Sequence, residues 1–392
     1  LKEAMSEDVL FTITKEHLET GLRGIPIGYC TTSHVDPKKG LFYLGRSITE
    51  LSTWQPEQVI YLLYHGKEGS NQELEKFSEM IKQCSCCSEQ VIASIEALPR
   101  QGHPMKLFCI ALLLLGMHES ADNYEEDCLN MIAKVPHLAA AVINHHAGFG
   151  KTPKPRLNLD YMENFCYMLQ IPNKREKELV SVMSLFNILH YDHGGGNLST
   201  FIGKAVASGL EDMYGSICAA MCALEGPRHG RANQDCLEFV RSVLNELGEK
   251  ATAKQVEELI RKRLLENKLV FGFGHAVLRV EDPRATLQYD FVQKHYPDHP
   301  LVKIALLLRT EGAKVLLENP KISDPYPNVD AISGTMLTAA GFAYPEYYTV
   351  LFGLSRSVGI AMQIVYERTE AREGRGTPIV RPKYLYKPRD QS

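Results

Sequence analysis

Apolar residues recur at spacings of three and four along most of the chain, which is the pattern of α-helices that bury one face. In 253–267 the charged residues occupy the opposite face, as expected of an exposed amphipathic helix. A β-rich stretch is confined to 29–46, where the turn sequence DPKKG at 36–40 predicts a small hairpin. The pattern therefore predicts a mainly α protein. The predicted helices cover residues 73–83, 133–144, 176–190, 216–225, 253–267, 300–319 and 347–370.

Composition is that of an ordinary globular chain. Its 392 residues are 44% hydrophobic and 23% charged, which suits two or more domains with a large core. The net charge is only −4 and no basic block is present, so we expect no nucleic-acid partner. The longest apolar stretch, 107–117, is too short to span a bilayer and predicts a buried helix, so we expect no membrane partner.

Ten cysteines raise the question of disulfides or zinc. The tightest group, Cys84, Cys86 and Cys87, lacks a second Cys/His pair at zinc-ribbon spacing. Scattered cysteines in a long chain mostly act as small buried apolar residues, so we expect free thiols in a reducing compartment. No signal or transit segment is visible, which favours the cytoplasm of a prokaryote. The mitochondrial matrix is the alternative for a trimmed eukaryotic chain.

The stretch VFGFGHAVLRVEDPRA, residues 270–285, contains two glycines, one histidine and two arginines within sixteen positions. A dinucleotide-binding fingerprint would need a third glycine where Val277 stands. The nearest approach to a phosphate-binding loop is GFGKT at 148–152, but its required first glycine is His145. Neither nucleotide motif is present. The remaining interpretation is a site that binds an anionic substrate while His275 transfers protons.

Four further stretches carry polar residues beside glycines or inside apolar runs: LHYDHGGGN, EGPRHGRAN, PNVDAISG, and LFGLSR with IVRPK. Each has an ordinary structural explanation. Histidines at helix ends are often caps, and Asp330 is as easily the N-cap of a helix that begins near Ser333. Arg381 would by default be a solvated cation of the tail. Arg356 is harder to explain, because an unpaired guanidinium in an apolar helix is costly to bury unless it has an ion-pair partner.

Taken together, three histidines, one aspartate and three arginines suit proton abstraction next to a carbonyl group. The carboxylate would be the base, an imidazole would support the enol, and the arginines would hold carboxylates in bidentate fashion. These residues are His193, His229, His275, Asp330, Arg284, Arg356 and Arg381.

The same motifs resemble those of citrate synthase along nearly the full chain. GFGHAVLRVEDPR at 272–284 fits the family pattern throughout, and ALEGPRHGRANQ, YPNVDAISG, EYYTVLFGLSR and HPM at 103–105 follow it in the right order and spacing. The resemblance implies condensation of acetyl-CoA with oxaloacetate and water to give citrate and free CoA. Asp330 would remove the methyl proton, His229 would stabilise the enol, and His275 would polarise and protonate the oxaloacetate carbonyl.

The resemblance also implies binding residues. Oxaloacetate or citrate would be held by His193, Asn197, His275, Arg284, Arg356 and Arg381. Coenzyme A would lie against Gly272, Phe273, Gly274 and Arg279. It implies no metal and no cofactor, since the arginines neutralise the anions and the CoA thioester is a substrate.

The implied fold is the mainly α, two-domain helical fold of citrate synthase. A large helical domain would comprise 1–226 and 333–392, from both chain ends, and a small inserted helical domain would comprise 227–332. The cleft between them would hold the site. A homodimer is implied, with Arg381 supplied in trans.

Four positions depart from the usual family pattern: Gly194, Arg228, Asn144 and Ile332. They put the acyl-chain preference and the coenzyme affinity in doubt without removing a reacting group. The alternatives are a 2-methylcitrate synthase that uses propionyl-CoA and a non-catalytic, ligand-binding paralogue.

Overall fold

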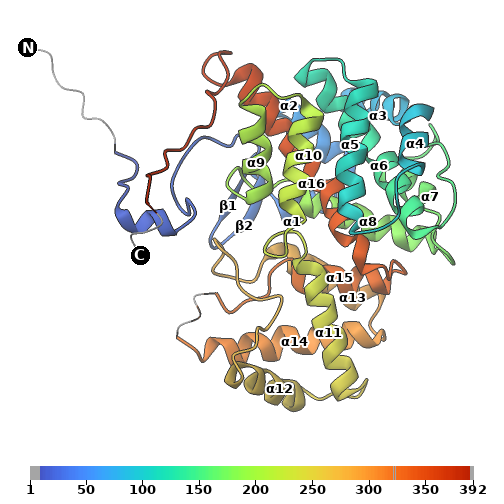
Figure 1. The fold of residues 1–392 in the computed structure, drawn as a ribbon. Helices are drawn as coiled ribbons and strands as arrows, with labels where there is room; N and C mark the ends of the chain where they lie inside the picture. Colours follow the sequence, from blue (N-terminus) through green and yellow to red (C-terminus); the bar gives the residue numbers. More distant parts are fainter. Residues whose placement is uncertain (1–8, 321, 323, 389–392) are drawn as a thin grey trace, which may run out of the picture.

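The computed structural model describes residues 9–320, 322 and 324–388, and within them the fold is helical with one small sheet (Figure 1). The sheet is antiparallel in the order β1-β2-β3, and its first pairing aligns Ser33 with Tyr43 and Asp36 with Gly40. The predicted hairpin and the mainly α class are both confirmed. The strands are β1 Ser33–Asp36, β2 Gly40–Tyr43 and β3 Arg46–Ser47.

Most helices form one large group, at the top of Figure 1. All five of the helices predicted in this group are present, and α8 begins and ends where its apolar period does. The group comprises α1 Ile48–Leu51, α2 Pro56–His65, α3 Asn71–Cys84, α4 Glu89–Glu96, α5 Pro104–Glu119, α6 Tyr124–Ala147, α7 Tyr161–Met168, α8 Glu176–His190, α9 Leu198–Ala207, α10 Met213–Leu224 and α16 Tyr348–Val365.

Five further helices gather at the other end of the molecule. Helix α15 packs against α11, α13 and α14 within this group and also touches α8 of the large group. The division into 1–226 with 333–392 and 227–332 stays a prediction, and its boundary at 332/333 falls inside α15. The helices are α11 Ala232–Leu247, α12 Ala253–Leu265, α13 Pro283–His295, α14 Pro300–Leu317 and α15 Asp330–Ala339.

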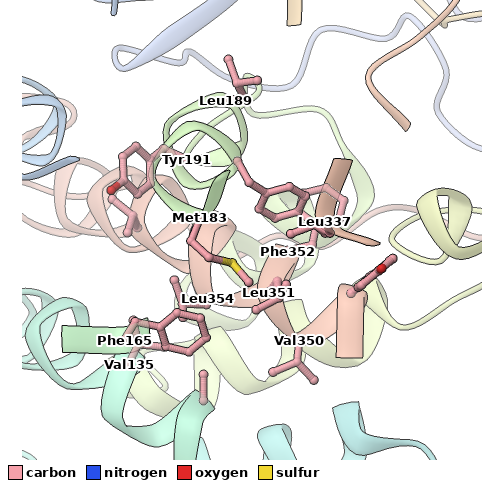
Figure 2. Close-up of a cluster of buried hydrophobic side chains, with 14 of the residues drawn as sticks. Val135, Phe165, Met183, Leu189, Tyr191, Leu337, Val350, Leu351, Phe352 and Leu354 are labelled. Carbon is pink, nitrogen blue, oxygen red and sulfur yellow. The ribbon is translucent and has the colours of Figure 1, made fainter. Parts of the chain in front are cut away.

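Helix α16 is the centre of the large group. All of its residues are buried, and it packs against α6, α8, α9 and α10. Figure 2 shows Val350, Leu351, Phe352 and Leu354 of this helix among side chains of the surrounding elements. Within the described residues, 345–370 is the one helical stretch long and apolar enough to cross a membrane, but its apolar window is entirely buried in the protein, as in a core helix.

The two chain ends leave the helical body together (Figure 1). The N-terminal arm, residues 9–31, contains the short 3-10 helix η1 Lys15–Glu19, and the C-terminal tail, residues 371–388, follows the π-helical turn η3 Tyr366–Glu370. A second 3-10 helix, η2 Pro345–Tyr347, precedes α16. Both ends expose large apolar side chains. They are Val9, Leu10, Phe11, Ile13, Leu18, Leu22, Ile27 and Tyr29 in the arm, and Ile379, Val380, Tyr384, Leu385 and Tyr386 in the tail.

Candidate active site

Two loops of the smaller helix group are joined by backbone hydrogen bonds. Gly274 N donates to Tyr326 O at 3.0 Å, and Asn328 N donates to Gly272 O at 2.9 Å. Gly272 has φ 85°, and a Cβ there would stand 2.8 Å from the backbone of Ala331, so only glycine allows this close approach. The pairing therefore holds the His275 loop against the start of α15, where Asp330 lies.

The His275 ring has a fixed tautomer. Its Nδ1 accepts hydrogen bonds from the backbone N–H groups of Val277 and Leu278, both at 3.0 Å. Burial, reinforced by the positive charge of Arg284, lowers the pKa of His275 to about 4. The ring is thus neutral at physiological pH and carries its proton on Nε2, which is free to donate to a ligand.

Asp330 is the first residue of α15 and is not its N-cap. The cap is Val329, and the Asp330 carboxylate makes no capping hydrogen bond, so the structural explanation for this residue fails. Its backbone N–H donates to Oδ1 of Asn328 at 3.0 Å. Burial raises the pKa of Asp330 to about 6, against the opposing charges of Arg284 and Arg356. The result is a partly exposed carboxylate of increased basicity.

His229 is held by α9, a helix of the large group. Its Nε2 accepts the backbone N–H of Ser199 at 3.2 Å and lies 2.9 Å from Oγ of the same residue. Burial, with the charge of Arg356 adding to it, lowers the pKa of His229 to about 4. Since Nε2 accepts, the neutral ring carries its proton on Nδ1. Two neutral imidazole donors therefore belong to this site.

His193 adjoins His275, with ring centroids 5.3 Å apart. Burial first, then the charges of Arg284 and Arg356, hold the pKa of His193 well below its ordinary value. Asn197, four residues on, caps α9 through Oδ1, and its Nδ2 donates to the carbonyls of His193 and Gly194. Asn197 thus shapes the loop that presents His193.

Arg284 is almost fully buried and is paired with a buried carboxylate. Its Nε and Nη2 donate to Asp282, with the Nη2 bond at 2.7 Å. Nη1 is the guanidinium nitrogen that Asp282 does not engage. The ion pair fixes the orientation of Arg284 and leaves one edge of it for an anion.

Arg356 is buried in α16 without an ion-pair partner. Its Nε donates to the carbonyl of His190 at 3.0 Å, and the guanidinium lies 4.8 Å from the ring centroid of Phe352. Within the part of the chain that the structure describes, no carboxylate oxygen lies within 4.0 Å of its nitrogens. Burial lowers the pKa of Arg356 to about 10, opposed by Asp192. Such a cation is costly to bury alone and is suited to receive an anion.

Arg381 does not join these residues within one chain. It lies exposed on the C-terminal tail, beyond Val380, whose N–H donates to Oγ of Ser208 at 2.9 Å. The tail and the N-terminal arm line a common groove of about 890 Å³, to which Arg381 contributes. The other two predicted arginines, Arg284 and Arg356, by contrast, act electrostatically on each other and on His193.

The residues expected to meet coenzyme A lie beside the reacting groups. Phe273, Gly274 and His275 line a cavity of about 370 Å³. The Phe273 ring packs so closely on Gly312 of α14 that any larger residue there would collide with it. Arg279 Nη1 donates to the carbonyl of Leu278 at 2.6 Å, so its side chain lies on its own loop.

Sequence reasoning missed four residues that orient the predicted ones. They are Asp192, Ser199, Asp282 and Asn328, and all but Ser199 lie within the quoted motifs. Asp192 is completely buried and accepts from Thr32, Ser33 and Gln363. The position of Asp192 beside His193 could have suggested a supporting role. Its partner Thr32, however, lies 160 residues away in the sequence, and one sequence alone does not predict such a contact.

The four departures from the family pattern have structural explanations or lie at the surface. Asn144 is buried and bonded through Nδ2 to Thr152 and Met168, which turns its amide away from any ligand role. Ile332 is fully buried, Gly194 adopts φ 69°, and Arg228 is exposed.

Comparison with known proteins gives a consistent match. The family model described as citrate synthase, C-terminal domain, matches residues 21–383. Citrate synthase 4, mitochondrial, of Arabidopsis thaliana is 37% identical, covering 98% of this chain and 84% of the relative. The mitochondrial enzyme of Saccharomyces cerevisiae is 32% identical, covering 97% and 83%. The expectation of a cytoplasmic protein is contradicted, because these curated relatives are mitochondrial.

Solved structures of citrate synthases are also similar to this chain. Citrate synthase from Thermotoga maritima superposes with a TM-score of 0.79 at 28% identity, covering 95% of this chain and 96% of that one. Citrate synthase from Thermoplasma acidophilum, in a ternary complex with carboxymethyl coenzyme A and oxaloacetate, gives 0.81 at 27% identity, covering 94% and 96%.

Proposed function

The chain belongs to the citrate synthase family, acyltransferases that form citrate from acetyl-CoA and oxaloacetate, and we propose how the residues of its cleft carry out this reaction. The observation that carries the proposal is the pair of neutral imidazoles, His229 and His275, each fixed as a donor by backbone N–H groups. They accompany a single carboxylate, Asp330, whose pKa is raised to about 6.

In the first step, the Asp330 carboxylate removes a proton from the methyl group of acetyl-CoA. The electron pair of the broken C–H bond forms the enolate, whose oxygen accepts a hydrogen bond from Nδ1–H of His229. A neutral donor of this kind stabilises the developing charge without first protonating the substrate. The raised pKa of Asp330 reduces the difference between its pKa and the much higher pKa of the methyl group, which favours proton transfer.

In the second step, the enol carbon attacks the carbonyl carbon of oxaloacetate. Nε2–H of His275 polarises that carbonyl and transfers its proton to the new alkoxide. Water then cleaves the citryl thioester, which releases citrate and free CoA. Neither histidine has to carry a positive charge at any point, in keeping with the low pKa of both rings. The proton that His275 gives up is restored to its Nε2 from the water that cleaves the thioester.

The carboxylates of oxaloacetate are held by His193, the free edge of Arg284, and Arg356. In this arrangement the dianion supplies the partner that Arg356 lacks. Arg381 completes the set from the second subunit of a homodimer, which its exposed place on the tail and the apolar residues around it support. Asn197 holds the loop, and Gly272, Phe273, Gly274 and Arg279 form the coenzyme A surface.

Binding is ordered, with oxaloacetate first. The dianion bridges His193 and Arg356 on the large domain, 1–226 with 333–392, and His275 and Arg284 on the small domain, 227–332. Closure of the two domains then completes the coenzyme A surface.

Release of CoA thiol measures this reaction directly. We expect rapid thiol release from acetyl-CoA that depends strictly on oxaloacetate, and much slower release from propionyl-CoA. Calorimetry should also show acetyl-CoA binding more tightly once oxaloacetate is bound. Thiol release independent of oxaloacetate, or a preference for propionyl-CoA, would contradict the proposal.

A further inference from the structure

Three thiols converge where α5 and α10 pack together, and none of them has a role in the proposed reaction. Cys109 comes from α5, and Cys218 and Cys222 come from α10, four residues apart on one face. The three Sγ atoms all lie within 4.8 Å of one another, and those of Cys109 and Cys222 are 3.6 Å apart. We name these residues the thiol cluster.

The spacing of the thiol cluster matches a metal site. Zinc–thiolate bonds are about 2.3 Å long, so two sulfurs on one ion stand about 3.8 Å apart in tetrahedral geometry and about 4.0 Å apart in trigonal geometry. The Cys109–Cys222 separation of 3.6 Å is close to these values, and no pair of sulfurs in the thiol cluster is more than 4.8 Å apart. All ten cysteines lie among the described residues and are free thiols, so no disulfide competes for these sulfurs.

The three thiols of the cluster differ in how far they are exposed to solvent. Cys109 and Cys218 are buried and Cys222 is exposed. Two buried sulfurs shield one side of the site, and the third lies at the surface of the single chain. Elsewhere in the described chain no other group of three metal-binding side chains has this spacing.

We propose that the thiol cluster binds one thiophilic d¹⁰ cation, Zn²⁺ or Cu⁺, through three thiolates. Soft sulfur ligands select these ions over Mg²⁺ or Ca²⁺. Binding releases the three thiol protons to solvent, and no redox step is involved. The ion would tie the last turn of α10 to α5, immediately before the turn that carries His229.

Cadmium is the probe for this site, because each Cd²⁺–thiolate bond adds to an ultraviolet charge-transfer band. We expect titration of the intact, fully reduced protein to saturate the band at one Cd²⁺ per chain. Cys222→Ser and Cys109→Ser should each weaken binding by more than about 100-fold, beyond the effect of losing an outer-sphere partner. Cys86→Ser, which is exposed, and Cys166→Ser, which is buried, are matched controls that should leave the band unchanged.

Competition separates the two candidate ions. Displacement of Cd²⁺ by Zn²⁺ indicates a tetrahedral site with a water ligand, and displacement by Cu⁺ alone indicates a trigonal site. The proposal is overturned if one equivalent of Cd²⁺ gives no band, or if the band survives in Cys222→Ser. It is also overturned if neither Zn²⁺ nor Cu⁺ displaces the probe.

Discussion

The side chains of the cleft are held by partners within the same chain, whereas many side chains of the two chain ends are exposed. In the cleft, backbone N–H groups fix the rings of His229 and His275, and a buried carboxylate fixes Arg284. At the chain ends, Arg381 is exposed and is surrounded by apolar side chains that face solvent. The contrast teaches that one chain fixes the orientation of the side chains proposed to carry out the proton chemistry, whereas Arg381 takes no part in that arrangement within its own chain.

The largest expected effect is that of Asp330→Asn, which tests whether Asp330 is the base. The amide is nearly isosteric but cannot accept the methyl proton, so we expect turnover to fall by roughly 10²–10⁴-fold with oxaloacetate binding retained. Thiol-release kinetics and calorimetry measure the two effects. Asp290→Asn, on the exposed face of α13, is the control and should keep full activity. Near-normal turnover in Asp330→Asn would show that another group is the base.

Arg356→Leu tests whether the unpaired guanidinium is a ligand group. Oxaloacetate affinity should fall by about 30-fold or more, since a buried charge contact to an anion is lost. Stability without ligand should not fall, because an apolar residue replaces a desolvated cation. Calorimetry of oxaloacetate binding checks the first effect and thermal unfolding checks the second. Arg356→Lys keeps the charge without the planar fork and should lie between.

Subunit mixing tests the role of the tail. Arg381→Ala and Asp330→Asn chains, each inactive alone, are combined where dimers can exchange. If Arg381 acts in trans, half the dimers are mixed and each has one intact site, so about a quarter of wild-type activity returns. Arg375→Ala, also exposed on the tail, should be active by itself. A mixture that stays inactive, with exchange verified by mass, would place Arg381 in its own subunit's site.

The smallest expected effect is a pH-dependent gain in stability. The pKa of Asp330 rises from 3.8 to about 6 on folding, so the folded chain holds this proton more tightly than the unfolded chain. The ionised carboxylate therefore destabilises the fold increasingly as pH rises from about 4 to 6, and fully above that range. Asp330→Asn should be about 1–2 kcal/mol more stable at pH 7.5, after allowance for partial exposure, with the gain vanishing near pH 4. Denaturant unfolding at both pH values measures it.

The long helices and the reacting residues were open to prediction for different reasons. Helices such as α8 and α14 show one apolar face in every turn, so periodicity alone finds them. The reacting residues stand in motifs whose order matches a family. The buried face of α9 carries only small or hydroxyl side chains, Ser199, Thr200, Gly203 and Ala207, so it shows no stripe of large apolar residues. Helix α15 is buried on nearly every side and therefore shows no contrast between two faces.

The supporting contacts of the cleft could not be predicted. Asp192 accepts from Thr32 and Ser33, and Arg356 from α16 meets the carbonyl of His190. These pairs are more than 150 residues apart, and pairing at that range depends on the finished packing. The thiol cluster escaped for the same reason, since Cys109 lies over a hundred residues from Cys218.

The central place of α16 constrains the order in which the protein can fold during synthesis. Its partners α6, α8 and α10 all precede it, and about 140 residues separate the end of α10 from the end of α16. At 5–20 residues per second, the ribosome needs roughly 7–28 s to supply that helix. During this interval the apolar faces that will enclose α16 stay open to solvent. The cell's chaperones are therefore expected to engage the first half of the chain, while α11 to α15 can close around one another earlier.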